Sequence, residues 1–164
     1  MKKIFLTYLI LIFLSSVAYA YGKKHVHGEG RLDAVVDKGN LSLNLELPLD
    51  VAVGFERKPK NGQEKAIFEA AEKILQDAGV LWMINPSAGC QLVSVQVGLP
   101  KFDGGHADID ASYTYRCANP TDLKTIETSL FKSFKRLYRL ELRHVGPKGQ
   151  GAIRLTPKNP ELRW

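Results

Sequence analysis

The chain has 164 residues, of which 24% are charged and 45% hydrophobic, with 23 basic and 17 acidic side chains. This length suits one domain and is too short for the two lobes of a typical solute-binding protein, since domains usually run to roughly 100–200 residues. The basic excess is mild, and its densest segment, residues 132–144, alternates charged with apolar residues as a half-buried strand does. The composition therefore favours no nucleic-acid partner.

The first twenty residues have the pattern of a secretory signal peptide. Two lysines precede an apolar run over residues 4–14, and a small-residue cleavage site ends at Ala20. The run is shorter than the roughly 20 residues that span a bilayer, so cleavage is favoured over a stable membrane anchor. We expect removal of residues 1–20 with their two lysines. Residues 21–164 would then form a single periplasmic domain with 21 basic and 17 acidic side chains, a net charge of +4.

Three hairpins are predicted by segments in which apolar and polar residues alternate. Such a period of two is typical of strands with one buried and one wet face, and turn residues separate the members of each pair. The six predicted strands are residues 25–37, 41–47, 93–97, 109–115, 137–145 and 152–155.

Two helices are expected between the hairpins, near residues 62–78 and 120–134. Asn61 can cap the first, with Glu64 three residues later as in a capping box, and apolar residues recur at helical spacing. The second has Pro120 at its first position, which favours a helix start.

The order of these elements, ββαββαββ, predicts an α+β fold. We expect a mostly antiparallel sheet of about six strands with both helices packed on one face and the other face wet. Ile74 and Phe131 should then be buried against the sheet. Residues 80–88 are interpreted as a loop in which Trp82 and Met83 cover the core.

Both cysteines, Cys90 and Cys117, lie in the mature region. An even number of cysteines in an oxidising compartment predicts one disulfide, with two free thiols as the alternative. If the two residues face each other directly, Val93 pairs with Thr114, which sets an apolar face against a polar one. A β-bulge, or a Cys90 that precedes the regular strand, would resolve this conflict.

Histidines supply the candidate metal ligands. His25 and His27 are spaced i and i+2, so on a strand both imidazoles point the same way, and His106 and Asp108 repeat this spacing. If the two strands meet, these side chains form a plausible tetrahedral zinc set. On spacing alone, an ordinary solvated surface is the more common explanation. His144 continues an apolar face and is interpreted as structural.

Catalytic motifs are absent from the sequence. It contains no G-x-S-x-G, no H-E-x-x-H and no phosphate-binding glycine loop. Acidic residues on the polar strand faces are explained by solvation. We therefore predict that the protein is not an enzyme.

Five segments follow one another along the mature chain: HVHGEGRLDAVVD, PLDVAVGFE, AGCQLVSVQV, HADIDASYTYRC and RLTPKNPELRW. Together they resemble the zinc-regulated ZrgA family of periplasmic zinc-binding proteins. His25 and His27 match the family's HxHG start, and His106 matches the histidine that opens its HxDxxxxYxYxC-like strand. The resemblance implies a periplasmic protein that binds zinc and assists zinc uptake alongside an ABC-type zinc importer.

Two departures from the family pattern limit the expected metal capacity. The long His- and Asp-rich stretch of typical members is shortened to FDGGHAD, and Arg57 replaces the histidine after GFE. We expect at most one zinc site, with His25, His27 and His106 as ligands and Asp108 as the best oxygen donor. The site should weaken below about pH 6, because protonated imidazoles do not bind metal.

An alternative function belongs to another class. The chain would be a metal-free periplasmic interaction module whose wet sheet face or edge strand docks a transporter or envelope protein. Convergence of the histidines in space discriminates between the two hypotheses.

Overall fold

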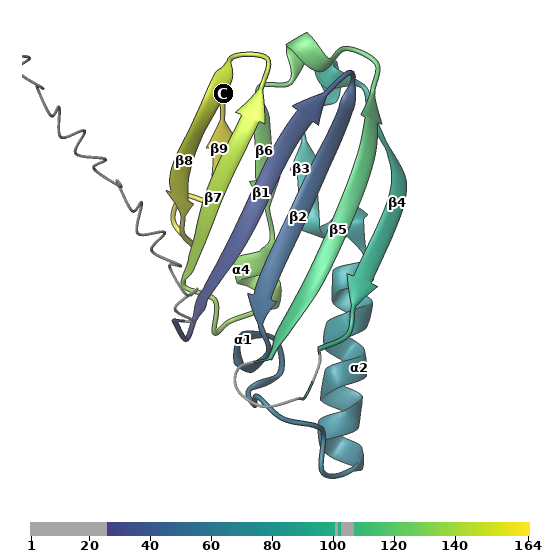
Figure 1. The fold of residues 1–164 in the computed structure, drawn as a ribbon, viewed down its shortest axis with the longest axis vertical. Coiled ribbons are helices and arrows are strands. Elements are labelled where there is room, and N and C mark those ends of the chain that lie inside the picture. The colour runs from purple at the N-terminus through teal and green to yellow at the C-terminus, as the bar shows by residue number, and fades with distance from the viewer. Residues whose placement is uncertain (1–25, 101, 103–106) are drawn as a thin grey trace, which may run out of the picture.

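The computed structural model of the protein describes residues 26–100, 102 and 107–164. The predicted signal peptide, His25 and His106 lie outside the described residues. Among the helices of the described part, none has the length and apolar composition that crossing a membrane requires. Figure 1 shows a large sheet with helices and a second, small sheet behind it.

The large sheet contains the six predicted strands in the order β4-β5-β2-β1-β7-β8. It is mixed, because β1 and β7 run parallel while the other neighbours pair antiparallel. A parallel pair needs a long connection, and the chain passes through the second layer before β7 starts beside β1. The strands are β1 (Glu29–Asp37), β2 (Asn40–Pro48), β4 (Cys90–Gly98), β5 (Asp108–Cys117), β7 (Arg139–Gly146) and β8 (Gly149–Leu155).

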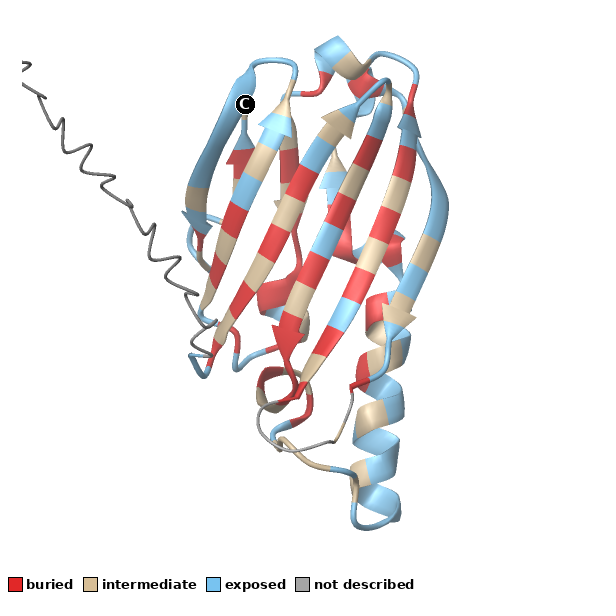
Figure 2. Cartoon of the chain, in the orientation of Figure 1, coloured by how far each residue is buried: buried red, intermediate tan, exposed pale blue. Residues whose placement is uncertain are grey.

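Alternate side chains of β2 and β5 fill the core, as the period of two predicts. Figure 2 shows the buried positions alternating along both strands. The two strands pair antiparallel, so their apolar residues share one face of the sheet. These core residues are Leu41, Leu43, Leu45, Leu47, Ile109, Ala111, Tyr113 and Tyr115.

The first predicted helix is confirmed as α2 (Gly62–Gln76). Its capping is also confirmed, since the Asn61 side chain accepts a hydrogen bond from the Glu64 backbone N–H at 2.9 Å. The buried side is narrower than expected: Ala71 and Leu75 are buried, whereas Ile74 is only half-buried. The helix lies beside β4, which is an edge strand of the large sheet.

The second predicted helix is wrong. Residues 120–134 form a 3-10 turn, a strand and one short helical turn instead. The TIET segment alternates half-buried and buried residues, and its β-branched side chains suit a strand that has partners on both sides. Phe131 is buried as expected, at 7% exposure. The three elements are η2 (Pro120–Asp122), β6 (Thr125–Thr128) and α4 (Leu130–Ser133).

The strand β6 is the centre of the small antiparallel sheet β3-β6-β9, which the sequence did not reveal. Its neighbours are β3 (Trp82–Ile84) and β9 (Glu161–Arg163). Residues 80–88 are therefore not a simple loop, because β3 lies between α3 (Ala78–Leu81) and η1 (Pro86–Ala88).

Of the two large residues expected to cover the core, only one does so. Trp82 is buried and packs edge-to-face against Tyr113, with ring centroids 5.4 Å apart. Met83, its neighbour on the strand, is 41% exposed, because successive side chains of a strand point to opposite sides.

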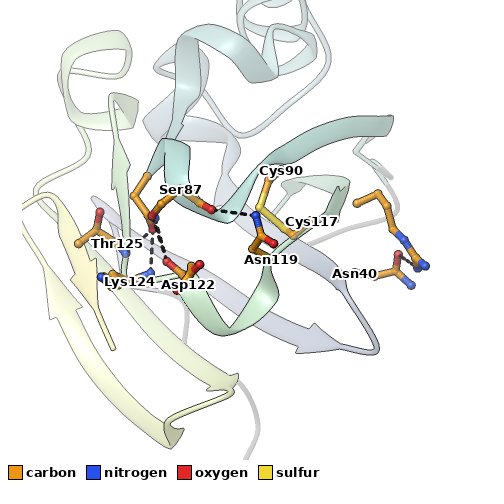
Figure 3. The surroundings of a disulfide bond; sticks show 10 residues. Asn40, Ser87, Cys90, Cys117, Asn119, Asp122, Lys124 and Thr125 are labelled. Carbon is orange, nitrogen blue, oxygen red and sulfur yellow. Dashed lines mark hydrogen bonds between the residues drawn. A yellow bond between two sulfur atoms is a disulfide. The ribbon is translucent and has the colours of Figure 1, made fainter.

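The predicted disulfide joins Cys90 and Cys117, which lie directly opposite each other on β4 and β5 (Figure 3). The register shifts between Leu92 and Ser94, so Val93 is the extra residue of a β-bulge. Ser94 rather than Val93 pairs with Thr114, and Val93 is 64% exposed. The bulge therefore resolves the conflict between the disulfide and the apolar face.

Side-chain hydrogen bonds fasten the turns η1 and η2 together beside the disulfide (Figure 3). The Asn119 amide donates to the Ser87 carbonyl at 3.3 Å. The Asn85 side-chain oxygen accepts from the backbone N–H groups of Lys124 at 2.8 Å and Thr125 at 3.0 Å. This end of the sheet is thus held by one covalent bond and several polar contacts.

Candidate metal centre

A short helix, α1 (Leu49–Val53), follows β2 directly and carries Asp50. The apolar residues of α1, Leu49, Val51 and Val53, are buried in the core and hold the helix in place. Gly54 ends the helix with φ of +90°, and its N–H donates to the Asp50 carbonyl at 2.8 Å. This left-handed conformation, which favours glycine, reverses the chain and returns Glu56 to the side of Asp50.

His27 lies in a turn in front of β1 rather than on the strand. The Glu29 N–H donates to the Val26 carbonyl at 3.1 Å, and Gly28 has φ of +80°. The strand begins at Glu29, so residues 26–28, which were predicted to belong to it, precede it instead. Because His27 lies in a turn, the direction of its side chain does not follow from the i, i+2 alternation of a strand. The side chain is 70% exposed.

Three side chains from these two segments converge at the end of the sheet where β1 begins. The His27 Nδ1 lies 2.8 Å from Asp50 Oδ2 and 3.8 Å from Glu56 Oε1. One potential ligand atom from each residue lies within 4.8 Å of the other two. We call His27, Asp50 and Glu56 the HDE cluster.

Asp50 is the most enclosed member of the HDE cluster. Its Oδ2 accepts the hydrogen bond from His27, whereas its Oδ1 is buried and has no hydrogen-bond partner among the described residues. A buried carboxylate oxygen without a partner costs free energy that a bound cation or water would recover. The unpartnered Oδ1 is thus an atom of Asp50 whose free energy a cation or an ordered water bound beside this carboxylate would lower.

The two carboxylates raise the pKa of His27 above its usual 6.5. The main cause is the hydrogen bond to Asp50, followed by the negative charges of Asp50 and Glu56. A cation that binds to Nδ1 must displace this proton, so the same carboxylates that attract a metal also favour the proton.

One imidazole nitrogen and two carboxylates form a donor set for zinc. Zinc binds histidine nitrogen at about 2.0–2.1 Å and carboxylate oxygen at about 2.0–2.2 Å, which places tetrahedral ligands about 3.4 Å apart. To reach this geometry, the pair His27 Nδ1 and Asp50 Oδ2, 2.8 Å apart, must open slightly, and Glu56 Oε1, 3.8 Å from Nδ1, must move slightly closer. Calcium and magnesium prefer oxygen ligands throughout, so the imidazole favours zinc over both.

Of the four ligands that the sequence predicted, only His27 is part of the HDE cluster. Asp108 is the first residue of β5 and lies in register with Pro48, while the neighbouring Ala107 carbonyl accepts from the Leu49 N–H at 2.8 Å. The start of β5 therefore lies beside the start of α1. His25 and His106 lie outside the described residues. Metal binding by His25, His106 and Asp108 remains a prediction.

Sequence reasoning missed Asp50 and Glu56 as candidate ligands. Both belong to PLDVAVGFE, one of the segments that carry the family resemblance, which was the available signal. Their spacing of six residues matches no ligand pattern on a regular helix or strand. They meet because Gly54 reverses the chain between them.

Arg57, where the family resemblance leads us to expect a histidine, pairs with Glu64 and lies beside Phe55. Its guanidinium donates to both carboxylate oxygens of Glu64, at 2.6 and 2.8 Å, and lies 5.0 Å from the centre of the Phe55 ring. These bonds from Arg57, followed by one from the Lys60 N–H, lower the pKa of Glu64 to about 2. Arg57 therefore binds the segment before α2 to Glu64 in the first turn of that helix, and it supplies no imidazole to the HDE cluster.

His144 lies on β7, away from the HDE cluster, as expected of a structural histidine. Its ring packs edge-to-face against Trp164, with centroids 5.7 Å apart. Gly151 lies opposite it on β8, where a Cβ would come within 2.8 Å of His144 Nε2.

The fold and the HDE cluster define a small α+β protein with a nitrogen and oxygen donor set suited to a divalent metal ion. The model of the ZrgA family of zinc uptake proteins matches residues 24–164, and the chain belongs to this family. No curated protein matches the chain significantly.

Proposed function

We propose that this protein is a periplasmic zinc-binding accessory protein, and that the HDE cluster provides three of its zinc ligands. The zinc uptake family to which the chain belongs supports the choice of metal. The observation that carries the proposal is the convergence of His27, Asp50 and Glu56, with a buried Asp50 oxygen that has no described partner.

A fourth ligand would complete the tetrahedron. The candidates are His25 and His106, predicted from the sequence, Asp108 at the start of β5, or a water molecule. The backbone contact between Leu49 and Ala107 supports a contribution from the start of β5. We propose a single zinc ion in all these cases.

Zinc is the cargo in this proposal, and the cluster suits reversible binding. The exposed imidazole of His27 gives solvent and partner proteins access to the ion. Asp50 orients the ring through its Nδ1 in the metal-free state. Loss of the His27 proton makes Nδ1 a ligand, and the two carboxylates then compensate the positive charge of the ion.

Export to the periplasm and partnership with an ABC-type zinc importer are parts of the same proposal. The signal-peptide pattern of residues 1–20 supports export, and the Cys90–Cys117 disulfide suits an oxidising compartment. The importer would receive the zinc that this protein binds. This step rests on the family's role in zinc uptake.

Calorimetric titration of zinc into residues 21–164 tests the proposal. The variants His27→Ala, Asp50→Asn and Glu56→Gln should each lose at least about tenfold in affinity, corresponding to about 1.4 kcal/mol. His144→Ala should bind as the wild type does, because this histidine lies outside the cluster. His25→Ala, His106→Ala and Asp108→Asn identify the fourth ligand.

Wild-type protein without saturable zinc binding at neutral pH would overturn the proposal. The metal-free interaction module would then become the favoured function. Equal affinities of the wild type and the three cluster variants would show that zinc binds elsewhere.

A further inference from the structure

We infer that the segment Arg136–Arg139 positions both halves of the HDE cluster, with Arg136 and Tyr138 as positioning residues. The cluster is built from two separate pieces of chain: the turn that contains His27, and α1 with the residues after it. The segment 136–139 contacts both pieces. This inference rests on the proposed zinc site and names the residues that would set its geometry.

The first half of the cluster is held through Gly28, the neighbour of His27. The Gly28 carbonyl accepts hydrogen bonds from the backbone N–H groups of Tyr138 at 3.0 Å and Arg139 at 3.4 Å. The Tyr138 hydroxyl donates to Glu29 at 2.9 Å, and the Arg139 guanidinium also bonds to this carboxylate. The segment 136–139 is thus bonded to Gly28 and to Glu29, the two residues that follow His27.

The Tyr138 ring lies directly against Gly28. A Cβ at this position would come within 2.3 Å of Tyr138 Cε1, which is closer than any real contact. The φ of Gly28, +80°, is also one that other residues rarely adopt. Any side chain here must displace either the ring or the turn that carries His27.

The second half of the cluster is held through Gly54, which lies between Asp50 and Glu56. A Cβ at Gly54 would come within 2.9 Å of the Arg136 guanidinium carbon, so this group lies against the end of α1. Gly54 is also the residue that reverses the chain after α1. Arg136 therefore packs on the turn that brings the two carboxylates together.

The positioning segment is itself fixed in the core. Leu137, between the two positioning residues, is 2% exposed, and its N–H donates to the Phe134 carbonyl at 3.0 Å. One anchored segment therefore contacts Gly28, which follows His27, and Gly54, which lies between Asp50 and Glu56. Loss of either contact should let the two halves separate and weaken metal binding without removing a ligand.

Two matched pairs of variants test this inference. Gly28→Ala is compared with Gly39→Ala, because Gly39 has nearly the same φ, +82°, but a Cβ there meets its nearest heavy atom at 3.5 Å. Arg136→Ala is compared with Arg116→Ala, an arginine that bonds Asn40 far from the cluster. Arg136→Lys serves as the conservative variant.

Zinc affinity, the visible absorption spectrum of the cobalt-loaded protein and the stability of the metal-free protein are measured for each variant. Gly28→Ala and Arg136→Ala should each lose about tenfold in zinc affinity relative to their controls, as for other groups that orient ligands. Their cobalt spectra should also change, because the ligand geometry changes. Arg136→Lys should recover part of the affinity.

Wild-type affinity and spectra in Gly28→Ala and Arg136→Ala would overturn the inference, provided that His27→Ala still loses zinc. The inference would also be overturned if each loss of zinc affinity were proportional to the loss of metal-free stability and Gly39→Ala showed the same loss. If His27→Ala also keeps full affinity, the proposed zinc site itself is wrong.

Discussion

The two ends of the large sheet are built from different kinds of contact. At one end, the Cys90–Cys117 disulfide and the Asn85 side chain join turns that are distant in sequence. At the other end, His27, Asp50 and Glu56 converge beside solvent. The strand β5 connects the two ends over ten residues, a distance of about 30 Å.

The difference separates stability from binding. Next to the disulfide, the Asn85 side-chain oxygen accepts hydrogen bonds from two backbone N–H groups. At the cluster end, the Asp50 Oδ1 is buried without a described partner, and two carboxylates lie close to each other. We expect changes at the first end to alter the free energy of unfolding, and changes at the second to alter zinc affinity.

The largest expected effect follows removal of the disulfide. The double variant Cys90→Ala/Cys117→Ala should lose about 3–4 kcal/mol of unfolding free energy, because the bond closes a long loop in the unfolded chain. The two cysteines are 27 positions apart. Urea denaturation of the metal-free protein measures the loss. Zinc affinity should stay at the wild-type value, and a large drop in affinity would show that the two ends are coupled.

Asn85→Ala should cost about 1 kcal/mol, because an exposed and a part-buried backbone N–H group lose their acceptor. The same denaturation experiment applies. Asn159→Ala is the control: this exposed side chain should change stability by about 0.5 kcal/mol or less. Equal stability of the two variants would mean that Asn85 does not fasten this end.

As the pH is lowered, zinc affinity should begin to decrease at a higher pH than it would with a histidine of ordinary pKa. The pKa of His27 is raised, chiefly by the hydrogen bond to Asp50, so protons compete with zinc already above pH 6.5. Below the His27 pKa, each pH unit should cost about tenfold in affinity, or about 1.4 kcal/mol. The sequence alone suggested weakening only below about pH 6.

Zinc titrations between pH 5 and 8 check this dependence. NMR titration of the metal-free protein should show the His27 pKa falling in the Asp50→Asn variant. The His27–Asp50 attraction stabilises the metal-free fold below the ordinary histidine pKa, and this contribution disappears as the pH rises through the raised pKa. An unshifted His27 pKa in the wild type would contradict the cluster geometry.

The smallest expected effect concerns the wet face between the two ends. Arg143 donates to both oxygens of Asp33, at 2.7 and 2.8 Å, but the side chains are 75% and 41% exposed. Arg143→Ala should therefore change stability by about 1 kcal/mol or less and leave zinc affinity unchanged. A clear loss of zinc affinity in Arg143→Ala would show that residues outside the HDE cluster also contribute to zinc binding.

The six strands of the large sheet and the first helix could be predicted because their sequence signals are local. The alternation of leucines along β2 indicates one buried face, and Asn61 together with Glu64 indicates the start of α2. The disulfide was also predictable, and the register conflict at Val93 indicated either a bulge or a Cys90 that precedes the regular strand; the structure has the bulge. Each of these signals lies within a few neighbouring residues.

The small sheet and the parallel pair could not be predicted in the same way. Leu123, Ile126 and Leu130 recur at a spacing that suits a helix, yet β6 is a strand because β3 and β9 pair with it. Those partners are more than thirty positions away in either direction. Tertiary pairing of this kind overrides local propensity.

The candidate site was only partly visible in the sequence for the same reason. His27 stood out as half of an HxH pair, although it lies in a turn and not on a strand. Asp50 and Glu56 come together through the Gly54 turn, and they meet His27 because β1 pairs with β2. Neither step leaves a recognisable ligand spacing.

The most direct measurement is an anomalous difference map at the zinc absorption edge, from crystals of residues 21–164 grown with one equivalent of zinc. We expect one strong peak about 2.0–2.2 Å from His27 Nδ1 and from carboxylate oxygens of Asp50 and Glu56. A peak bound to other residues, or its absence from this cluster at full zinc occupancy in solution, would contradict it.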